Sequence, residues 1–573
     1  MDENTTIDQA TIEDATGFEE RADQLSVSEL RGETVVEDIF DQIRRELITR
    51  GLVLLEGPRG CGKTHMMRYV ELVCEDEINK PFAVYVSFNR YLRLEPLLGI
   101  RTDALNLFQS WALALLVRAT HEKVRQLAPA ADLDPERLLN VTSEQLDLLI
   151  ARLERGQQPN QEEELTAESL RVEVVISYLR LAAAACGRRR TVLLLDDAAL
   201  TLSRDLLIEF FDLVRVLKTH DISPKASVYP GTTEYGPRFH ADHEGRRVAA
   251  WLPVDDPRYL NVMRNIAAVR FHDVGDVPAE VNTVLMYAAF GVPRAYLTLL
   301  RAWQLRKGGN PQAVLNEVVR EHRDARLAEY RSLAAKLPTL ATLVRTGEKL
   351  FDEAVASLVK QNRELADQNE KQLLLGVPSA DLSPMAQRMM NLLNEAGLVR
   401  QESPVSHGEN RVYMRFMPHL GALIAARAFE SGKGGGSRRI VEALSRPSTK
   451  HPVRRSLKNL IGDLVGDLHL DEPPCQNCTA QRLSPNQKFC HVCGHKLLDE
   501  STFERCMRLP IDEVPGLSDF KLARLREQEI TTIGALVALS DPGTAIRRAR
   551  GMGPQRAAQV IDTVHQYVDE FLS

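Results

Sequence analysis

No apolar run in the sequence reaches the roughly 18 residues that a membrane-spanning helix needs. The first residues, MDENTTIDQATIEDATGFEE, are acidic and lack the basic start and the apolar stretch of a secretion signal. These two absences argue against a membrane-spanning helix and against export. We therefore expect a cytoplasmic protein.

Cysteine is sparse, and four of the eight cysteines are scattered along the chain. The other four form two CxxC pairs, Cys475 with Cys478 and Cys490 with Cys493. In a long chain without a secretion signal, such pairs indicate a metal site rather than disulfides. Four thiolates complete the tetrahedral coordination of Zn²⁺ and leave no open position for water. We therefore predict a structural zinc site, in a zinc ribbon over residues 471–500.

Charge is unevenly distributed along the chain. Residues 1–33 hold ten acidic residues and two arginines, whereas residues 438–459 hold seven basic residues and one glutamate. Low hydrophobicity and charge of one sign predict that the tail 1–33 is disordered. The basic stretch belongs to a predicted linker, residues 431–470, which begins with a glycine-rich hinge. It either lies along a phosphate backbone or is a solvated linker with incidental charge.

Hydrophobic residues make up 44% of the sequence and charged residues 26%, as in ordinary soluble proteins. At roughly 100–200 residues per domain, 573 residues are too many for one hydrophobic core and predict three to five domains. The chain is therefore expected to be multidomain.

The most specific motif follows the apolar stretch 52–55, which is typical of a buried strand, and a helical pattern follows the motif. In a motif of this kind, backbone N–H groups wrap phosphates, the lysine reaches the β- and γ-phosphates, and the threonine hydroxyl ligates Mg²⁺. We therefore predict an ATP–Mg²⁺ site. The motif matches GxxxxGK[ST] in full and consists of Gly57, Pro58, Arg59, Gly60, Cys61, Gly62, Lys63 and Thr64.

Two carboxylates, Asp196 and Asp197, end a second apolar stretch, residues 191–195. P-loop folds place their second Mg²⁺ contact at such a strand end. We expect Asp196 to bind the metal through water, and Asp197 to lie beside the γ-phosphate and polarise the attacking water. Two aspartates at the surface end of a strand are the alternative interpretation.

Polar residues after a third strand and at a later helix start complete the predicted site. Thr232 and Thr233 follow the stretch 226–229 and are candidates for sensing the γ-phosphate, although hydroxyls beside glycine also cap turns. Arg294 begins a helix and is placed to reach the nucleotide from a helical lid.

These motifs, in this order, resemble the AAA+/STAND branch of P-loop ATPases, nearest to the origin-recognition and replication-initiator family. The resemblance covers residues 34–305 and gives Arg294 the lid-arginine role called sensor 2. It implies an α/β core at 34–275 with a helical insertion at 104–184, then a helical lid and spacer at 276–375. Asp-Asp at 196–197, where initiators more often have Asp-Glu, implies slow hydrolysis. No arginine finger is identifiable.

Two further modules are predicted in the C-terminal half. Residues 376–430 predict a helix and two strands around a loop, the outline of a winged helix. Residues 505–573 contain glycine turns at Gly516 and at Gly551 and Gly553, and resemble a paired helix-hairpin-helix module. Such modules contact DNA or protein, and the arginines near Gly551 favour DNA phosphate.

The predicted fold class is therefore multidomain: an α/β P-loop core with a helical lid, then an α-rich winged helix, a zinc ribbon and a small all-α helix-hairpin-helix domain. The predicted function is an ATP-hydrolysing DNA-binding switch of initiator or loader type. Such a switch could act in replication, in a mobile element or in phage defence. It binds ATP, Mg²⁺, Zn²⁺ and double-stranded DNA, and forms homo-oligomers. The alternative is a STAND-like signalling ATPase that oligomerises on sensing an unidentified protein or a foreign nucleic acid. A scaffold that binds ATP without hydrolysing it is a third reading.

Overall fold

A computed structural model describes most of the chain. No helix among the described residues combines the length and the apolar character that crossing a membrane requires. The described residues are 22, 25–36, 38–131, 133–197, 204–271, 277–306, 309–406, 408, 411–430, 436–483, 487, 489–497, 502–539 and 541–572.

The predicted disordered tail differs from the structure at its C-terminal end, and residues 1–21 lie outside the described part. Helix α2 (Val27–Gly32) falls inside the tail and begins with a capping box between Ser26 and Glu29. Leu25 and Leu30 are buried in one cluster with Leu72. The acidic composition of the tail did not predict this short helix, which begins at a capping box and packs through two leucines against Leu72.

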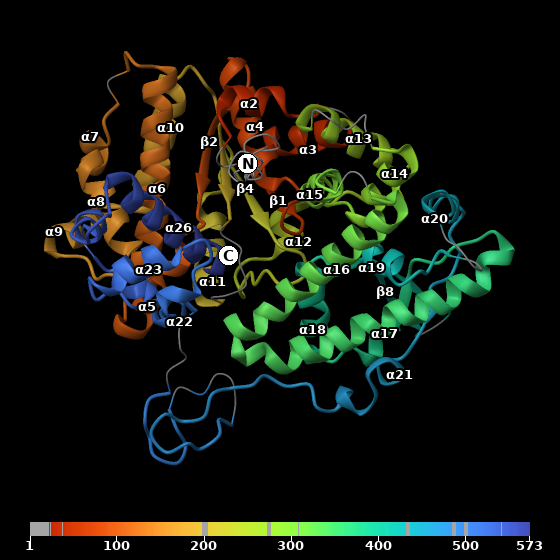
Figure 1. The fold of residues 1–573 in the computed structure, drawn as a ribbon. Helices are drawn as coiled ribbons and strands as arrows, with labels where there is room; N and C mark the ends of the chain where they lie inside the picture. Colours follow the sequence, from red (N-terminus) through yellow and green to blue (C-terminus); the bar gives the residue numbers. More distant parts are fainter. Residues whose placement is uncertain are drawn as a thin grey trace, which may run out of the picture.

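The predicted α/β core is confirmed, and the structure shows that its sheet is parallel (Figure 1). The strand order is β2-β3-β4-β1-β5, and every pairing is parallel. Alternate residues of β1 enter different cores: Val53 and Leu55 join one hydrophobic cluster, and Leu52 and Leu54 the other. Burial on both faces explains the nearly continuous apolar strands. The strands are β1 (Leu52–Glu56), β2 (Phe82–Ser87), β3 (Thr191–Asp196), β4 (Ile222–Val228) and β5 (Gly245–Ala249).

A helical insertion occupies the interval between β2 and β3 and packs around the fully buried Trp111. Its residues share one core with one face of the sheet and with α11. The helices next to the sheet are α3 (Asp38–Ile48), α4 (Lys63–Asp76) and α11 (Arg204–Leu217), with the short α12 (Ala241–Glu244) before β5. The insertion contains α5 (Glu95–Ile100), α6 (Ala104–Leu127), α7 (Pro135–Leu139), α8 (Ser143–Leu153), α9 (Gln161–Ser169) and α10 (Val172–Ala185).

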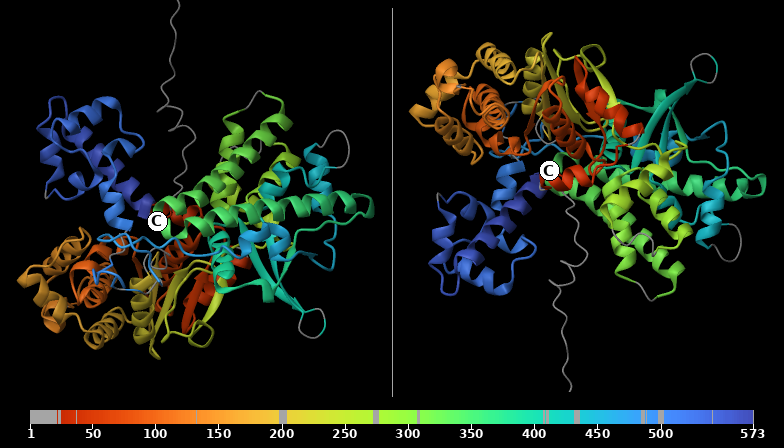
Figure 2. Two further views of the ribbon diagram at one scale, coloured as in Figure 1. Left: turned by 90° about the horizontal axis from the view of Figure 1, so that it is seen from below. Right: turned by 90° about the horizontal axis from the view of Figure 1, so that it is seen from above.

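A run of helices follows β5 and joins the core of the opposite face of the sheet. The two longest lie side by side and carry the chain to a second sheet (Figures 1 and 2). These helices are α13 (Tyr259–Arg270), α14 (Ala279–Ala288), α15 (Pro293–Gln304), α16 (Pro311–Lys336) and α17 (Ala341–Leu365).

The second sheet, of order β7-β8-β6-β9, belongs with the helices around it to what we call the C-terminal sheet unit, residues 375–461. Strands β7 and β8 form an antiparallel pair, whereas β9 pairs with β6 in parallel. The strands are β6 (Leu375–Pro378), β7 (Val399–Ser406), β8 (Val412–Pro418) and β9 (Val453–Arg454), and the helices are α18 (Pro384–Glu395), α19 (Leu420–Ala425), α20 (Ser437–Leu444) and α21 (Leu457–Ile461).

The predicted linker 431–470 therefore differs from the structure. Helix α20 buries Ile440, Ala443 and Leu444, and α21 buries Leu457 and further apolar residues. These residues lie at helical spacing, so each short helix has one apolar face that packs on the core. Residues 431–435 of the glycine-rich hinge lie outside the described residues.

A C-terminal helical module, residues 502–572, packs against the insertion (Figure 1). Phe503 and Cys506 are buried in the cluster that contains Tyr91 and Leu94 of the insertion. The module therefore continues the core that covers one face of the parallel sheet. Its helices are α22 (Thr502–Arg508), α23 (Asp519–Arg526), α24 (Ile533–Val537), α25 (Pro542–Arg547) and α26 (Pro554–Leu572).

Candidate nucleotide site and metal centre

The GxxxxGK[ST] motif forms the loop between β1 and α4. Gly60 and Gly62 have φ values of +79° and +92°, in the left-handed region that favours glycine. A Cβ atom on Gly57 would lie 2.5 Å from the Sγ of Cys61, and one on Gly60 would lie 2.9 Å from the Cβ of Arg294. The glycines therefore allow a tight loop with helix α15 close against it.

Lys63 is the first residue of α4, and only 6% of it is exposed. Its Nζ donates to the carbonyl oxygens of Gly57, at 2.7 Å, and Pro58, at 3.2 Å. The ammonium also lies 4.2 Å from the centroid of the Tyr229 ring. Both hydrogen-bond acceptors belong to the GxxxxGK[ST] loop, so the lysine side chain folds back onto this loop.

Asp196 ends β3 and is completely buried. Its Oδ2 accepts a hydrogen bond from the Tyr85 hydroxyl at 3.1 Å, and its Oδ1 has no hydrogen-bond partner among the described residues. A buried carboxylate oxygen without a partner is costly, and a cation or its water shell removes that cost. The carboxylate therefore fits a Mg²⁺ contact.

Asp197 has a φ of +57°, which is uncommon for a residue other than glycine. Its backbone N–H donates to the Oγ of Ser227 at 2.9 Å, and Ser227 pairs in register with Leu55 of β1. Strained backbone of this kind concentrates at functional sites. Strand β4 therefore links the end of β3 to the strand that leads into the P-loop.

The two candidate threonines have different environments. Thr233 Oγ1 accepts from the backbone N–H of Tyr229 at 3.1 Å and donates to its carbonyl oxygen at 3.0 Å. Thr232 is buried, and its Oγ1 has no partner among the described residues. Thr233 thus caps a turn, and Thr232 retains a hydroxyl for a ligand.

Arg294 is the second residue of α15, and its side chain is exposed. Its backbone N–H donates to the carbonyl oxygen of Gly60 at 3.2 Å. The fold therefore brings the start of helix α15 to the P-loop, which, like Asp196 and Thr232, lies at the carboxyl edge of the sheet.

Sequence reasoning missed Tyr85 and Tyr229, which contact Asp196 and Lys63. Each lies near the carboxyl end of a strand, β2 or β4. A polar ring that ends an apolar strand was the only available signal, and it is weak because tyrosine is common in strands.

The four clustered cysteines form a separate centre. Their sulfur atoms lie within 4.8 Å of one another, at 3.6 Å between Cys475 and Cys493 and 3.5 Å between Cys478 and Cys490. Sulfurs bound at about 2.3 Å to one tetrahedral zinc are about 3.8 Å apart. The backbone N–H of His495 lowers the pKa of Cys493 to about 6, which favours the thiolate. The cluster therefore fits one Zn²⁺ with four sulfur ligands.

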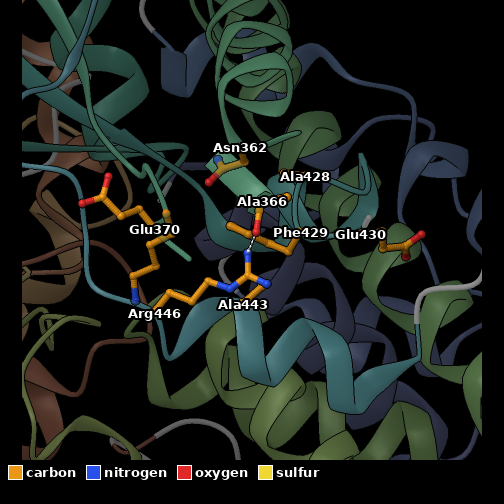
Figure 3. Close-up of a pocket in the computed structure, with 9 residues that line it drawn as sticks. Asn362, Ala366, Glu370, Ala428, Phe429, Glu430, Ala443 and Arg446 are labelled. Carbon is orange, nitrogen blue, oxygen red and sulfur yellow. Dashed lines mark hydrogen bonds between the residues drawn. The ribbon is translucent and has the colours of Figure 1, made fainter. Parts of the chain in front are cut away.

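A small hollow between the C-terminal end of α17, the segment after it and the C-terminal sheet unit does not add to these sites (Figure 3). Asn362 Nδ2 donates to the carbonyl oxygens of Leu358 and Gln372, and Arg446 Nη1 donates to that of Ala366 at 3.3 Å. These polar groups serve the fold.

No protein-family model matches the chain, and no curated protein matches it. Among solved structures, the chain is similar to the Aeropyrum pernix Orc1 protein in complex with DNA, at 13% sequence identity and a TM-score of 0.26. The similarity covers 73% of this chain and 91% of that chain. A likeness of this degree carries no functional assignment, so function is argued below from the residues of the chain itself.

Proposed function

We propose that the chain binds and hydrolyses ATP at the carboxyl edge of the parallel sheet. The observation that carries this proposal is a complete P-loop beside the buried Asp196, whose Oδ1 is unpartnered among the described residues. Thr64 and Asp196 are the residues that would hold Mg²⁺, which, when bound, neutralises charge on the phosphate oxygens. Lys63 and the loop N–H groups bind the phosphates.

The remaining predicted residues act around the terminal phosphate. Asp197 orients and polarises the attacking water, and Thr232 is the better placed of the two threonines to sense the γ-phosphate. Arg294 approaches from the lid helix, because its backbone is already bonded to Gly60. We expect turnover to be slow, since a shorter aspartate replaces the glutamate that activates water in faster relatives of the resembled family.

We further propose that the C-terminal module contacts DNA through its two glycine turns. Gly516 and Gly551 have φ values of +83° and +86°, and both are exposed. An exposed turn without a Cβ lets backbone N–H groups approach a phosphate. Around the second turn lie exposed arginines that add attraction to phosphate, and they are Arg547, Arg548, Arg550 and Arg556.

The packing of the C-terminal module supports a switch in which DNA and ATP affect each other. The module shares a core with the insertion, and the insertion shares that core with the sheet that carries Asp196. A DNA contact on the module and a nucleotide contact at the sheet would thus both act on one continuous hydrophobic core. We place the function with initiator- or loader-type ATPases that form homo-oligomers.

One observation favours the alternative of an ATPase that senses a protein. Three large apolar side chains next to the zinc ligands, Leu483, Phe489 and Val492, are 75%, 60% and 65% exposed. Apolar side chains exposed together are typical of protein-binding surfaces. Binding of a partner protein to the zinc ribbon would then trigger oligomerisation of the chain.

The deciding experiment measures the ATPase rate of the full chain with and without duplex DNA, at low and at high salt. Truncating the C-terminal module is unsuitable, because Phe503 and Cys506 belong to the shared core. Lys63→Ala should abolish nucleotide binding or turnover. Arg547→Ala combined with Arg548→Ala should remove stimulation by DNA and leave the basal rate.

The matched control for the arginine pair is Lys360→Ala with Arg363→Ala, two exposed cations of α17 far along the chain from both turns. The DNA-coupled function is supported if DNA stimulates the ATPase rate, if high salt suppresses this stimulation, and if the Arg547→Ala, Arg548→Ala variant loses it while the control keeps it. An unstimulated rate in every variant refutes the DNA half and favours the protein-sensing alternative. Unchanged turnover in Lys63→Ala refutes the nucleotide site.

A further inference from the structure

A pocket with an empty volume of about 740 Å³, part of it open to solvent, lies between the P-loop, α16 and the C-terminal sheet unit. The P-loop contributes Pro58 and Arg59, and the end of β4 contributes Tyr229. The last residue of α18 and the turn after it contribute residues 395–397. Three parts of the chain thus meet next to the predicted phosphate site.

Helix α16 lines the pocket with residues spaced three or four apart, among them His322, Arg326, Glu329 and Lys336. His322 Nε2 and Arg326 Nε are buried and have no hydrogen-bond partner among the described residues. Arg326 Nη2 lies 2.7 Å from Glu329, an ion pair of adjacent turns that leaves Nε unused. Two buried polar atoms of one helix face therefore lack partners in the part of the chain that the structure describes.

Burial, and then the charge of Arg326, lowers the pKa of His322 to about 3. The imidazole is therefore neutral near pH 7 and has one N–H to donate. Its ring lies 5.6 Å, centroid to centroid, from that of His419, the residue that precedes α19. The ring is thus held between two elements, and its unpartnered nitrogen suits an acceptor such as a phosphate oxygen.

The pocket is next to the lysine that the nucleotide proposal uses. Tyr229 lines the pocket and also carries the Lys63 ammonium over its ring. Arg59 belongs to the P-loop itself and lines the same pocket. With Arg326 and Lys336, the lining includes three cations against the two carboxylates of Glu329 and Glu395. The local charge therefore favours an anion.

We propose that this pocket binds a phosphoryl group, with Arg326 as its cation and His322 as a second donor. The inference rests on the proposed function for its location, since the P-loop forms one wall. The phosphoryl group belongs either to the terminal phosphate of ATP held on the P-loop or to a separate small phosphate-bearing molecule.

Such binding connects the nucleotide to the C-terminal sheet unit. Helix α16 packs against α17 and α19, and His322 contacts His419 between α16 and that unit. A phosphate that binds Arg326 weakens the ion pair between Arg326 and Glu329. Phosphate binding therefore changes the interactions of helix α16, against which the C-terminal sheet unit packs. The unit then responds to whether the terminal phosphate is present.

The test measures binding of ATPγS and of ADP to the full chain by calorimetry, in wild type and in Arg326→Met, Arg326→Lys and His322→Phe. Arg323→Met is the matched control, because Arg323 belongs to the same helix, pairs with Asp324 and is outside the pocket lining. Loss of a charged hydrogen bond predicts that Arg326→Met weakens ATPγS binding about tenfold or more. ADP binding and the control should change less than about twofold.

A second arm titrates inorganic pyrophosphate into Lys63→Ala, with and without Arg326→Met. If Arg326→Met weakens pyrophosphate binding, the ligand of the pocket is a separate phosphate-bearing molecule. If Arg326→Met weakens the binding of ATPγS but not of pyrophosphate, the ligand is the terminal phosphate of ATP. If neither probe responds to Arg326 or His322 substitution in folded variants, the proposal is wrong. That result is distinct from failure of the nucleotide site, in which Lys63→Ala binds ATPγS as tightly as wild type.

Discussion

The ion pair between Arg93 and Asp569 should fasten the C-terminal module to the insertion. Arg93 Nη2 lies 2.5 Å from Asp569 Oδ1, and the two side chains are only 7% and 21% exposed. Asp569→Ala leaves the arginine buried without its partner. Removing one member of a buried pair costs about 3–5 kcal/mol, because the remaining charge has no compensation.

This cost should appear as local opening of α22 and α26 rather than as unfolding of the sheet. At about 1.4 kcal/mol per tenfold change, a loss of 3 kcal/mol raises the opening constant by more than about a hundredfold. Hydrogen exchange of the amides in α22 and α26 measures that constant directly. Amides of β1 and β3 should keep their protection.

Two further variants make the argument refutable. Arg93→Met combined with Asp569→Leu should restore most of the protection, because apolar residues can replace a buried ion pair at little cost. Glu442→Ala breaks the exposed Arg438–Glu442 pair, whose side chains are 82% and 59% exposed, and should change exchange in α20 by less than about threefold. If Asp569→Ala changes exchange no more than Glu442→Ala does, the pair does not fasten the module.

Four further outcomes are expected. Asp196→Asn should lower the ATPase rate at least about a hundredfold while nucleotide binding persists, as measured by turnover and calorimetry. Cys478→Ser should reduce bound zinc from one per chain toward zero by elemental analysis, and a chelator should do the same to wild type. Arg547→Ala with Arg548→Ala should lower the salt slope of DNA binding by about two. Burial, and then the charges of Arg246 and Arg190, lower the pKa of Lys225 from 10.5 to about 7. Between these two pH values the unfolded chain binds more protons than the folded chain, so the stability of the fold rises with pH. Lys225→Met should flatten that rise when denaturation is measured over a series of pH values.

Local motifs made much of the candidate chemistry predictable. The residues from Gly57 to Thr64 are contiguous, so their spacing alone specifies a loop that wraps phosphate. The two CxxC pairs likewise place four sulfurs on two short turns, and the folded chain brings them within 4.8 Å. The α/β core was predictable from apolar stretches separated by helical patterns.

Packing over long sequence distances was not predictable in the same way. The sequence suggested a disordered tail over residues 1–33 and a linker over residues 431–470, because composition and charge dominate when the partner surface is unknown. The leucines and isoleucines of helices α2, α20 and α21 in these segments are buried in the structure. They indicate a packed helix only once the surface that they cover is known. The docking of Phe503 against the insertion depends on the same condition.

By itself, the sequence determined the P-loop and the cysteine pairs, because each motif has its chemistry within a few neighbouring residues. Tertiary structure alone decided that Arg59, Tyr229 and Arg326 line one pocket, and that Thr232 rather than Thr233 retains an unpartnered hydroxyl among the described residues. Contacts between distant residues depend on which apolar faces bury one another. That choice belongs to the whole chain and has no local pattern from which to be read.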